Sequence, residues 1–267
     1  MPKRFWKNVS SIKNNDYKPY SKRFWEIDAA RGVAIILMIL FHVAFDLRYA
    51  GLYELDAGWV FWYLLPRMIA AIFIILVGIS ATLSYNKSKK DAVNRFIRRG
   101  LGIFSFGMAI TLATYLFFAE GTILFGILHF IGISYIMSVP FLTKVCSANR
   151  ARETDVSREM RRKNILIGLS VLISGFYLQT MTFDFPWLLW LGFMPANFYT
   201  FDYFPIFPWF GFILLGIYLG NRFYTNGKRT FRINGRPDGL LTFLGRNSLA
   251  IYLVHQPMLA LLIAVAR

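Results

Sequence analysis

Cysteine, histidine and acidic residues are all scarce in this chain of 267 residues. The single cysteine, Cys146, excludes a disulfide within the chain, and three histidines scattered along the sequence do not match a zinc motif, so we expect no metal. Acidic residues number 14 against 30 Lys and Arg, which gives a formal net charge of +16. Such an excess of positive charge indicates an anionic partner, either nucleic acid or a membrane surface.

Long polar stretches are also few, because apolar runs fill most of the chain. Hydrophobic residues make up 56% of it, and several runs approach the length of about 20 residues that crosses a bilayer. The basic residues lie in the loops between these runs, so we attribute the charge to the membrane surface and expect no nucleic-acid partner. The sequence therefore predicts a polytopic, all-α protein that sits in the lipid bilayer of the cell membrane.

We expect a bundle of about seven transmembrane helices in a single domain, residues 26–267. Residues 1–25 are basic and aromatic, as is typical of a segment that lies on the cytoplasmic leaflet, and they do not resemble a cleavable signal peptide. Residues 182–205 are rich in aromatics and proline but contain no Lys or Arg, which favours an interfacial or re-entrant segment over a clean span. The predicted spans are about 29–47, 59–85, 100–119, 122–142, 164–181, 206–220 and 244–266.

The basic residues divide unequally between the two sides of these predicted spans. Of the 30 Lys and Arg, 27 fall in the N-terminal part of the chain as far as Arg31, in the loops after the second, fourth and sixth spans, and at the start of the seventh. Only Arg48, Arg67 and Arg267 fall on the other side. Because loops rich in Lys and Arg stay in the cytoplasm, we expect a cytoplasmic N-terminus and an extracytoplasmic C-terminus.

Three ionisable residues share one face of the first predicted span. Arg31 and His42 are eleven residues apart, which is about three turns or about 16 Å along a helix. Asp46 lies one turn beyond His42, within reach of its imidazole, where it could fix the tautomer of that ring. Ionisable side chains inside a membrane usually face a bundle interior or a wet cavity. The alternative is a packing histidine capped by Asp46, with Arg31 as an anchor among the head groups.

The two other histidines and one arginine also fall within predicted spans. His129 lies in the fourth span and His255 near the middle of the seventh, so both could meet His42 in one cavity. The alternative for each is a hydrogen bond to a neighbouring helix. Arg67 stands apart from the basic loops, near the start of the second span, where it could pair with Asp46 or Glu54.

Four stretches of the sequence resemble known membrane acyltransferases. Arg31 and His42, with ten residues between them, match the arginine–histidine signature of the membrane-bound acyltransferase-3 family. The wider pattern is more similar to the catalytic domain of heparan-alpha-glucosaminide N-acetyltransferase and its prokaryotic relatives. It covers nearly the whole chain from Glu26 to Pro257, in the stretches EIDAARGVAIILMILFHVAFDL, FGILHFIGISY, FPWFGFILLGIYLG and LGRNSLAIYLVHQP.

The resemblance implies an enzyme that passes an acyl group from cytoplasmic acyl-CoA, for example acetyl-CoA, to a sugar or glycan beyond the membrane. It makes His42 the catalytic residue, with Asp46 as its orienting partner. The basic mouth would bind the phosphates of CoA through Arg31, with Arg246 and Asn247 as further candidates. The chain is short and lacks the extra helices of the lysosomal enzyme, so the acceptor and the oligomeric state, such as a homodimer, stay open. The competing hypotheses are a proton-coupled transporter that uses the same histidines as a relay, and a purely structural membrane protein.

Overall fold

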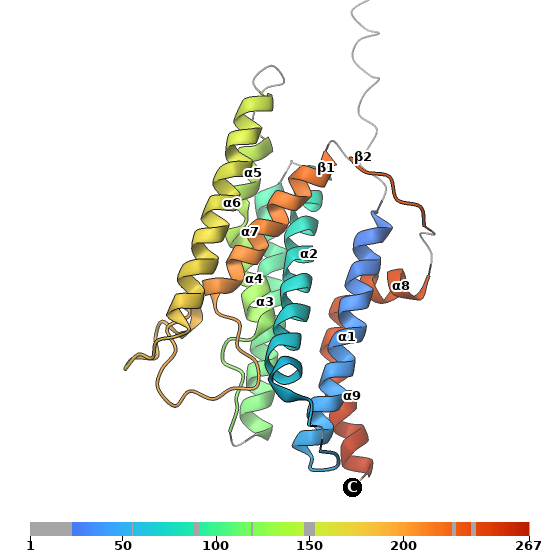
Figure 1. Ribbon diagram of the computed structural model, residues 1–267, viewed down its shortest axis with the longest axis vertical. Helices are drawn as coiled ribbons and strands as arrows, with labels where there is room; N and C mark the ends of the chain where they lie inside the picture. The colour runs from blue at the N-terminus through green and yellow to red at the C-terminus, as the bar shows by residue number, and fades with distance from the viewer. Residues whose placement is uncertain are drawn as a thin grey trace, which may run out of the picture.

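The computed structural model describes residues 23–54, 56–87, 91–118, 120–146, 153–225, 228–235 and 239–266. Within these residues the chain is a bundle of helices that run roughly side by side (Figure 1). Five helices in this described part of the chain are long and apolar enough to cross a membrane. They are α1 (Trp25–Tyr49), α2 (Leu65–Lys87) together with the π-helical turn Val60–Leu64 before it, α3 (Ala92–Phe117), α7 (Ile206–Phe223) and α9 (Ser248–Ala266).

Two of the predicted spans differ from a single helix. The fourth is divided at Ser138 into α4 (Ile127–Met137) and α5 (Val139–Cys146), where Pro140 in the first turn of α5 has no N–H to continue the ladder. The seventh is divided at Asn247 into the short α8 (Leu240–Arg246) and α9. The predicted fifth span corresponds to α6 (Glu153–Leu178), whose first half carries many charges.

Helices α2 and α7 meet at glycines, which let their backbones approach closely. A methyl group at Gly216 would lie 2.2 Å from the carbonyl oxygen of Ile75, and one at Gly78 would lie 2.4 Å from that of Ile213. Small residues at helix contacts are typical of bundles in lipid, where packing replaces the hydrophobic driving force. Around this contact lie the most deeply buried apolar side chains, which include Ile74, Phe96, Phe130, Leu214 and Ile217.

Helix α1 packs chiefly on α8 and less extensively on α9 and α2. Its contact with α8 again needs glycine, because a methyl group at Gly32 would lie 2.0 Å from the Leu241 carbonyl oxygen. On the other side of the contact, a methyl group at Gly245 would lie 1.7 Å from the carbonyl oxygen of Asp28. Backbone contact therefore fixes the start of α1 against α8.

Residues 182–205 form no spanning helix, in agreement with the sequence prediction. They contain one 3₁₀ turn, η2 (Leu189–Leu191), and isolated bridges join Phe183 to Pro195 and Phe125 to Tyr203. The only named strands in the described residues form a minimal antiparallel pair, β1 (Tyr224–Thr225) with β2 (Lys228–Arg229).

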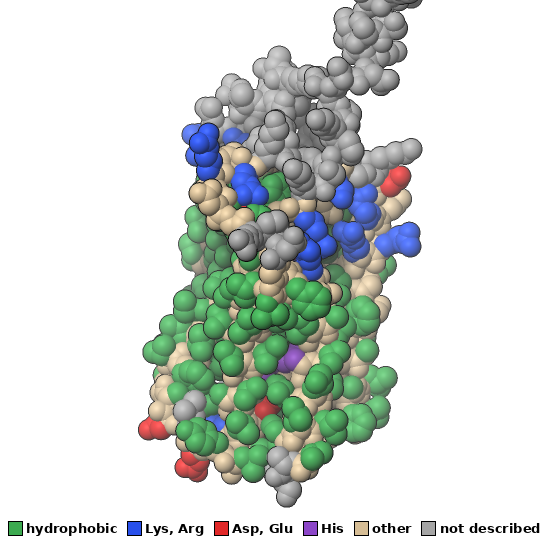
Figure 2. Space-filling view, turned by 90° about the vertical axis from the view of Figure 1, so that its right-hand side faces the viewer, with side chains coloured by type: hydrophobic (Ala, Val, Ile, Leu, Met, Phe, Trp, Pro, Cys, Tyr) green, Lys and Arg blue, Asp and Glu red, His purple; other side chains and the backbone are tan. Residues whose placement is uncertain are grey.

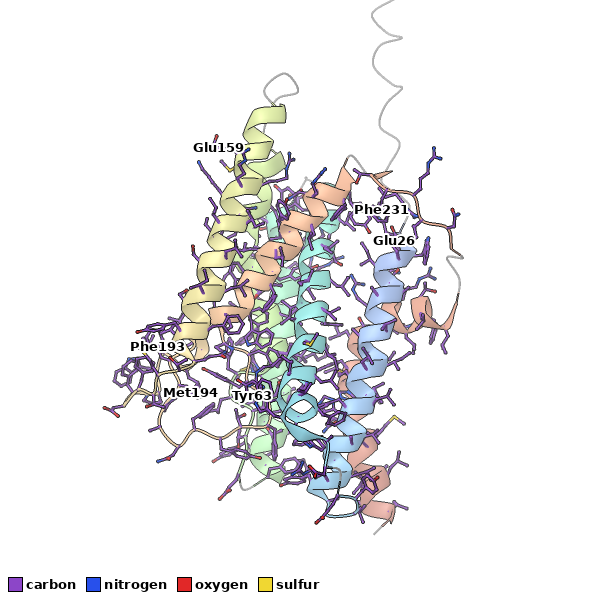
Figure 3. The ribbon with its side chains drawn as sticks, in the orientation of Figure 1. Glu26, Tyr63, Glu159, Phe193, Met194 and Phe231 are labelled. Atoms are coloured by element: carbon purple, nitrogen blue, oxygen red, sulfur yellow. The ribbon has the colours of Figure 1, made fainter. Side chains whose placement is uncertain are left out.

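The two ends of the bundle differ in charge. Lys and Arg side chains gather at one end of the visible face, above a broad apolar band (Figure 2). Helix α1 begins at this basic end, and the chain finishes at the opposite end (Figure 1). Glu26 and Glu159 lie toward the basic end, whereas Tyr63, Phe193 and Met194 lie toward the other (Figure 3).

Candidate functional site

The predicted site residues of α1 lie along its contact with α8, α9 and α2. At the basic end, Asp28 is buried and receives three arginines. Arg31 Nη1 lies 3.2 Å from Asp28 Oδ1, while the Nε atoms of Arg246 and Arg23 lie 3.6 and 3.7 Å from Oδ2. The structure thus brings two predicted phosphate-binding residues, Arg31 and Arg246, to one point. Guanidinium groups gathered in this way are suited to binding phosphate groups.

Asp28 is not among the residues that the sequence predicts for the site. The sequence feature that could have identified it is its position three residues before Arg31, a spacing at which helical side chains meet. Arg31 also donates to Ser80 Oγ on α2, so the cluster joins α1 to α2 through Arg31 and to α8 through Arg246. Asn247 does not join it: the exposed side chain donates from Nδ2 to the Phe243 carbonyl, 2.9 Å away.

A second ion pair fastens the loop after α7 to the start of α1. Arg229 Nη2 lies 3.3 Å from Glu26 Oε2, and the Tyr224 hydroxyl donates to Glu26 Oε1 at 3.3 Å. Burial, helped by the adjacent Glu26 carboxylate, raises the pKa of Tyr224 and keeps it a donor. Figure 3 shows Glu26 beside Phe231 of this loop at the basic end.

Two of the three histidines meet in the second half of α1. The rings of His42 and His255 are in edge-to-face contact, with centroids 5.0 Å apart. Nδ1 of His42 lies 2.9 Å from the Met38 carbonyl oxygen, and Nδ1 of His255 lies 2.6 Å from that of Tyr252. A carbonyl oxygen only accepts, so both Nδ1 atoms carry the proton and both Nε2 atoms are left as bases.

This geometry corrects the predicted role of Asp46. The Met38 carbonyl, rather than Asp46, holds the tautomer of His42. Asp46 instead accepts a hydrogen bond from Nε2 of Gln256, 3.1 Å from its Oδ1, and so joins α1 to α9. Asp46 lies one helical turn beyond His42, and no hydrogen bond between them is found in the described chain. Gln256 is thus the hydrogen-bond partner of Asp46, where the sequence had predicted the imidazole of His42.

His129 does not join the other two histidines. Its Nδ1 accepts the N–H of Gly126 at 3.2 Å, and its Nε2 lies 3.2 Å from Thr111 Oγ1 on α3. Both ring nitrogens are therefore used, in a ring that is only 1% exposed. A small cavity of about 10 Å³ beside it is lined by Asp202 and by Tyr252 of α9. The helix-packing interpretation fits His129.

Asp202, in the segment before α7, was not predicted from the sequence either. Its Oδ2 accepts the N–H of Ile127 at 2.9 Å and so caps the start of α4. Burial raises the pKa of this carboxyl to about 6, with the hydrogen bond from Ile127 opposing the shift. The sequence feature that could have drawn attention to Asp202 is a single acid in an aromatic segment. Only the fold shows that it caps the start of α4.

Arg67 pairs with neither Asp46 nor Glu54. Its guanidinium lies over the ring of Tyr63, 3.5 Å from the centroid, and Nη1 donates to the Tyr63 carbonyl at 3.0 Å. The side chain is exposed on α2. It therefore lies outside the row formed by Arg31, His42 and Asp46.

The side chains described above differ in which ligands they could hold. Among the described residues no group of three or more His, Cys, Asp and Glu side chains lies close enough to hold a metal ion. What the contact between α1, α8 and α9 offers is a positive cluster at the basic end and two imidazole bases further along. This combination offers a place for an anionic group and, further along α1, a place for proton exchange.

Comparison with protein families identifies the class of this protein. The model of the family "Heparan-alpha-glucosaminide N-acetyltransferase, catalytic" matches residues 23–257, which is most of the chain. The protein belongs to this family, as the sequence motifs indicated, and membership implies a membrane N-acetyltransferase. Comparison with curated proteins gives no match, and comparison with solved structures gives none either.

Proposed function

We propose that this protein is an acyltransferase that moves an acetyl or other acyl group from cytoplasmic acyl-CoA to an amino sugar or glycan on the far side of the membrane. The observation that carries the proposal is the state of His42. Its Nδ1 proton is committed to the Met38 carbonyl, which leaves Nε2 as a general base on the same helix as the arginine cluster. Family membership supports the reaction class.

The donor is proposed to enter from the basic end. Arg31, Arg246 and Arg23 gather around Asp28 at this end, and guanidinium groups are the donors that bind phosphates best. The distance of about 16 Å along α1 between Arg31 and His42 is comparable to an extended pantetheine arm. The thioester would then lie beside the imidazole of His42.

The chemistry needs a base at that point. A protonated acceptor amine must lose two of its three protons to become an amide nitrogen. His42 Nε2 takes the first proton, which frees the nitrogen lone pair to attack the thioester carbonyl. The second proton leaves the nitrogen of the tetrahedral intermediate as the C–S bond breaks. One proton ends on the sulfur of CoA and the other leaves to solvent. Removing a positioned base of this kind typically costs about 10² to 10⁴ in rate.

The test is release of free CoA from acetyl-CoA in the presence of glucosamine, by the purified wild type and by His42→Ala. The variant should lose turnover by at least about 100-fold while keeping near-normal affinity for CoA, because that affinity comes from phosphates at the far end of the row. His129→Gln is the matched control, since its ring packs α3 against α4. Equal rates in wild type and His42→Ala would refute the catalytic role.

The donor site has its own test. Arg31→Gln should weaken CoA binding in calorimetry and should affect dephosphorylated analogues less. Arg23→Gln is a useful comparison, because Arg23 contacts the same carboxylate but its side chain is 67% exposed. Unchanged CoA affinity in Arg31→Gln would leave Arg31 as a structural partner of Asp28 only.

The orientation proposed is seven spans with the N-terminus inside and the C-terminus outside. It is supported by the gathering of Lys and Arg at one end of the bundle (Figure 2). In a background without Cys146, cysteines placed at Asn94 and Ala151 should resist a membrane-impermeant thiol reagent in sealed cells. Cysteines at Asp56 and Tyr199 should react with it. Labelling at position 94 or 151 would reverse the topology.

A further inference from the structure

Two hydrogen-bond acceptors beside His42 are buried without a donor. Oδ2 of Asp46 and Nε2 of His255 have no hydrogen-bond partner in the part of the chain that the structure describes. Each belongs to a side chain whose other polar atom is already engaged, Asp46 Oδ1 with Gln256 and His255 Nδ1 with the Tyr252 carbonyl. A buried acceptor that gave up water without gaining a donor lowers stability, so each such atom in a native fold needs an explanation, of which a bound ligand is one.

These acceptors lie around the base of the proposed reaction. The ring of His255 contacts that of His42, and Asp46 lies one helical turn further along α1. His42 contributes a third acceptor, because its Nε2 is also without a proton. The cluster therefore offers three acceptor atoms, one of them on a carboxylate, and presents no donor of its own at these atoms.

The complementary ligand is a group that has only donors and a positive charge. A protonated primary amine has three N–H donors and no acceptor, as the lysine ammonium shows. A hydroxyl group has a single donor and two acceptor lone pairs, and would leave acceptors of the cluster unpaired. The carboxylate of Asp46 adds charge attraction, which is strong in a site shielded by lipid and protein.

We infer that Asp46 and His255, together with His42, bind the ammonium group of the acceptor. This assignment rests on the proposed function for the role of His42 and adds the residues that select an amine over a hydroxyl. Asp46 balances the positive charge until the first proton leaves, and His255 accepts a hydrogen bond from the nitrogen while His42 takes that proton. Gln256 holds Asp46 in place through its other oxygen.

The test is a binding titration without any acyl donor. Glucosamine and glucose, which differ at one position by an amine or a hydroxyl, are titrated by calorimetry into the full-length protein in detergent. Wild type should prefer glucosamine by at least about tenfold, since a site built to pair with N–H groups rejects an analogue that lacks them. Asp46→Asn and His255→Gln should each reduce that preference by about tenfold or more.

The controls are the same substitutions away from the cluster, Asp56→Asn in an exposed loop and His129→Gln against α3. Both should keep the preference of the wild type, and thermal unfolding shows whether every variant is folded. An unchanged preference in folded Asp46→Asn or His255→Gln would overturn the assignment. So would a wild type that binds the two sugars equally, or neither of them.

The titration separates this inference from the proposed function. A wild type that binds glucosamine selectively but never releases CoA would refute acyl transfer and leave the ammonium site standing. A wild type that transfers acetyl groups, with Asp46→Asn still preferring glucosamine, would refute the ammonium site and leave acyl transfer standing.

Discussion

Helices α2 and α7 pack through glycines and aliphatic side chains, whereas α1 meets α8 and α9 through arginines, carboxylates and imidazoles. The first contact encloses fully buried residues such as Ile74, Leu214 and Ile217. The second holds a buried Asp28 among three arginines and, within the described residues, two acceptors beside His42 that have no hydrogen-bond partner. Buried polar groups that lack partners lower stability, so the two contacts should respond differently to the loss of a single side chain. We call the contact of α2 with α7 the apolar half of the bundle, and the contact of α1 with α8 and α9 the polar half.

Among the variants that test this contrast, Asp28→Asn should have the largest effect on stability. Removing the carboxylate leaves Arg31, which is mostly buried, beside Arg246 without their shared counter-charge. Loss of one member of a buried ion cluster costs about 3 kcal/mol or more of unfolding free energy. Denaturant-induced unfolding of the purified protein measures it. Glu159→Gln removes an exposed pair with Lys163 and should change nothing measurable, so equal effects of the two variants would contradict the picture.

The next variant is at Asp202, which lies where α9 approaches the apolar half. Asp202 lines one small cavity there together with Tyr252 of α9 and His129 of α4. Its pKa is raised from 3.8 to about 6, so folding favours the protonated form. The resulting stabilisation is full below pH 3.8, is lost as pH rises toward about 6, and is absent above it. The loss amounts to roughly 3 kcal/mol at most.

Asp202→Asn removes this dependence and keeps an oxygen that accepts the Ile127 N–H. Above about pH 6 the variant should be at least as stable as wild type, whereas near pH 4 the two should converge. Thermal unfolding across this pH range makes the comparison. A wild type whose stability increases between pH 4 and 6, relative to the variant, would reverse the sign and refute the burial argument.

The smallest expected effect is that of Gly216→Ala in the apolar half. The new methyl group would meet the Ile75 carbonyl, so α2 and α7 must separate, at a cost of about 2 kcal/mol. Gly102→Ala is the matched control in α3, where the added methyl group meets nothing within 4 Å, and helix propensity predicts a slight stabilisation. Unfolding of both variants in the same detergent provides the measurement. Equal stability of the two would show that the glycine contact is not needed.

Much of the fold could be predicted from the sequence, because the length of an apolar run and the charge of a loop are properties of a short stretch of chain. The five long helices coincide with predicted spans, and residues 182–205 form no spanning helix, as their prolines and interrupted apolar pattern indicated. The breaks at Ser138 and Asn247 were missed. Both occur within apolar stretches, where hydropathy continues although the backbone direction changes. A total of seven spans stays a prediction.

The sequence by itself determined the membrane class, the family and the row of Arg31, His42 and Asp46, because helical spacing alone places residues on one face. Only the tertiary structure decided their partners. Asp28 gathers the arginines, the Met38 carbonyl fixes the imidazole, Gln256 takes Asp46, and His255 rather than His129 reaches His42. Those pairings depend on how α8 and α9 pack against α1. Periodicity within one helix carries no information about which residue of another helix it will meet.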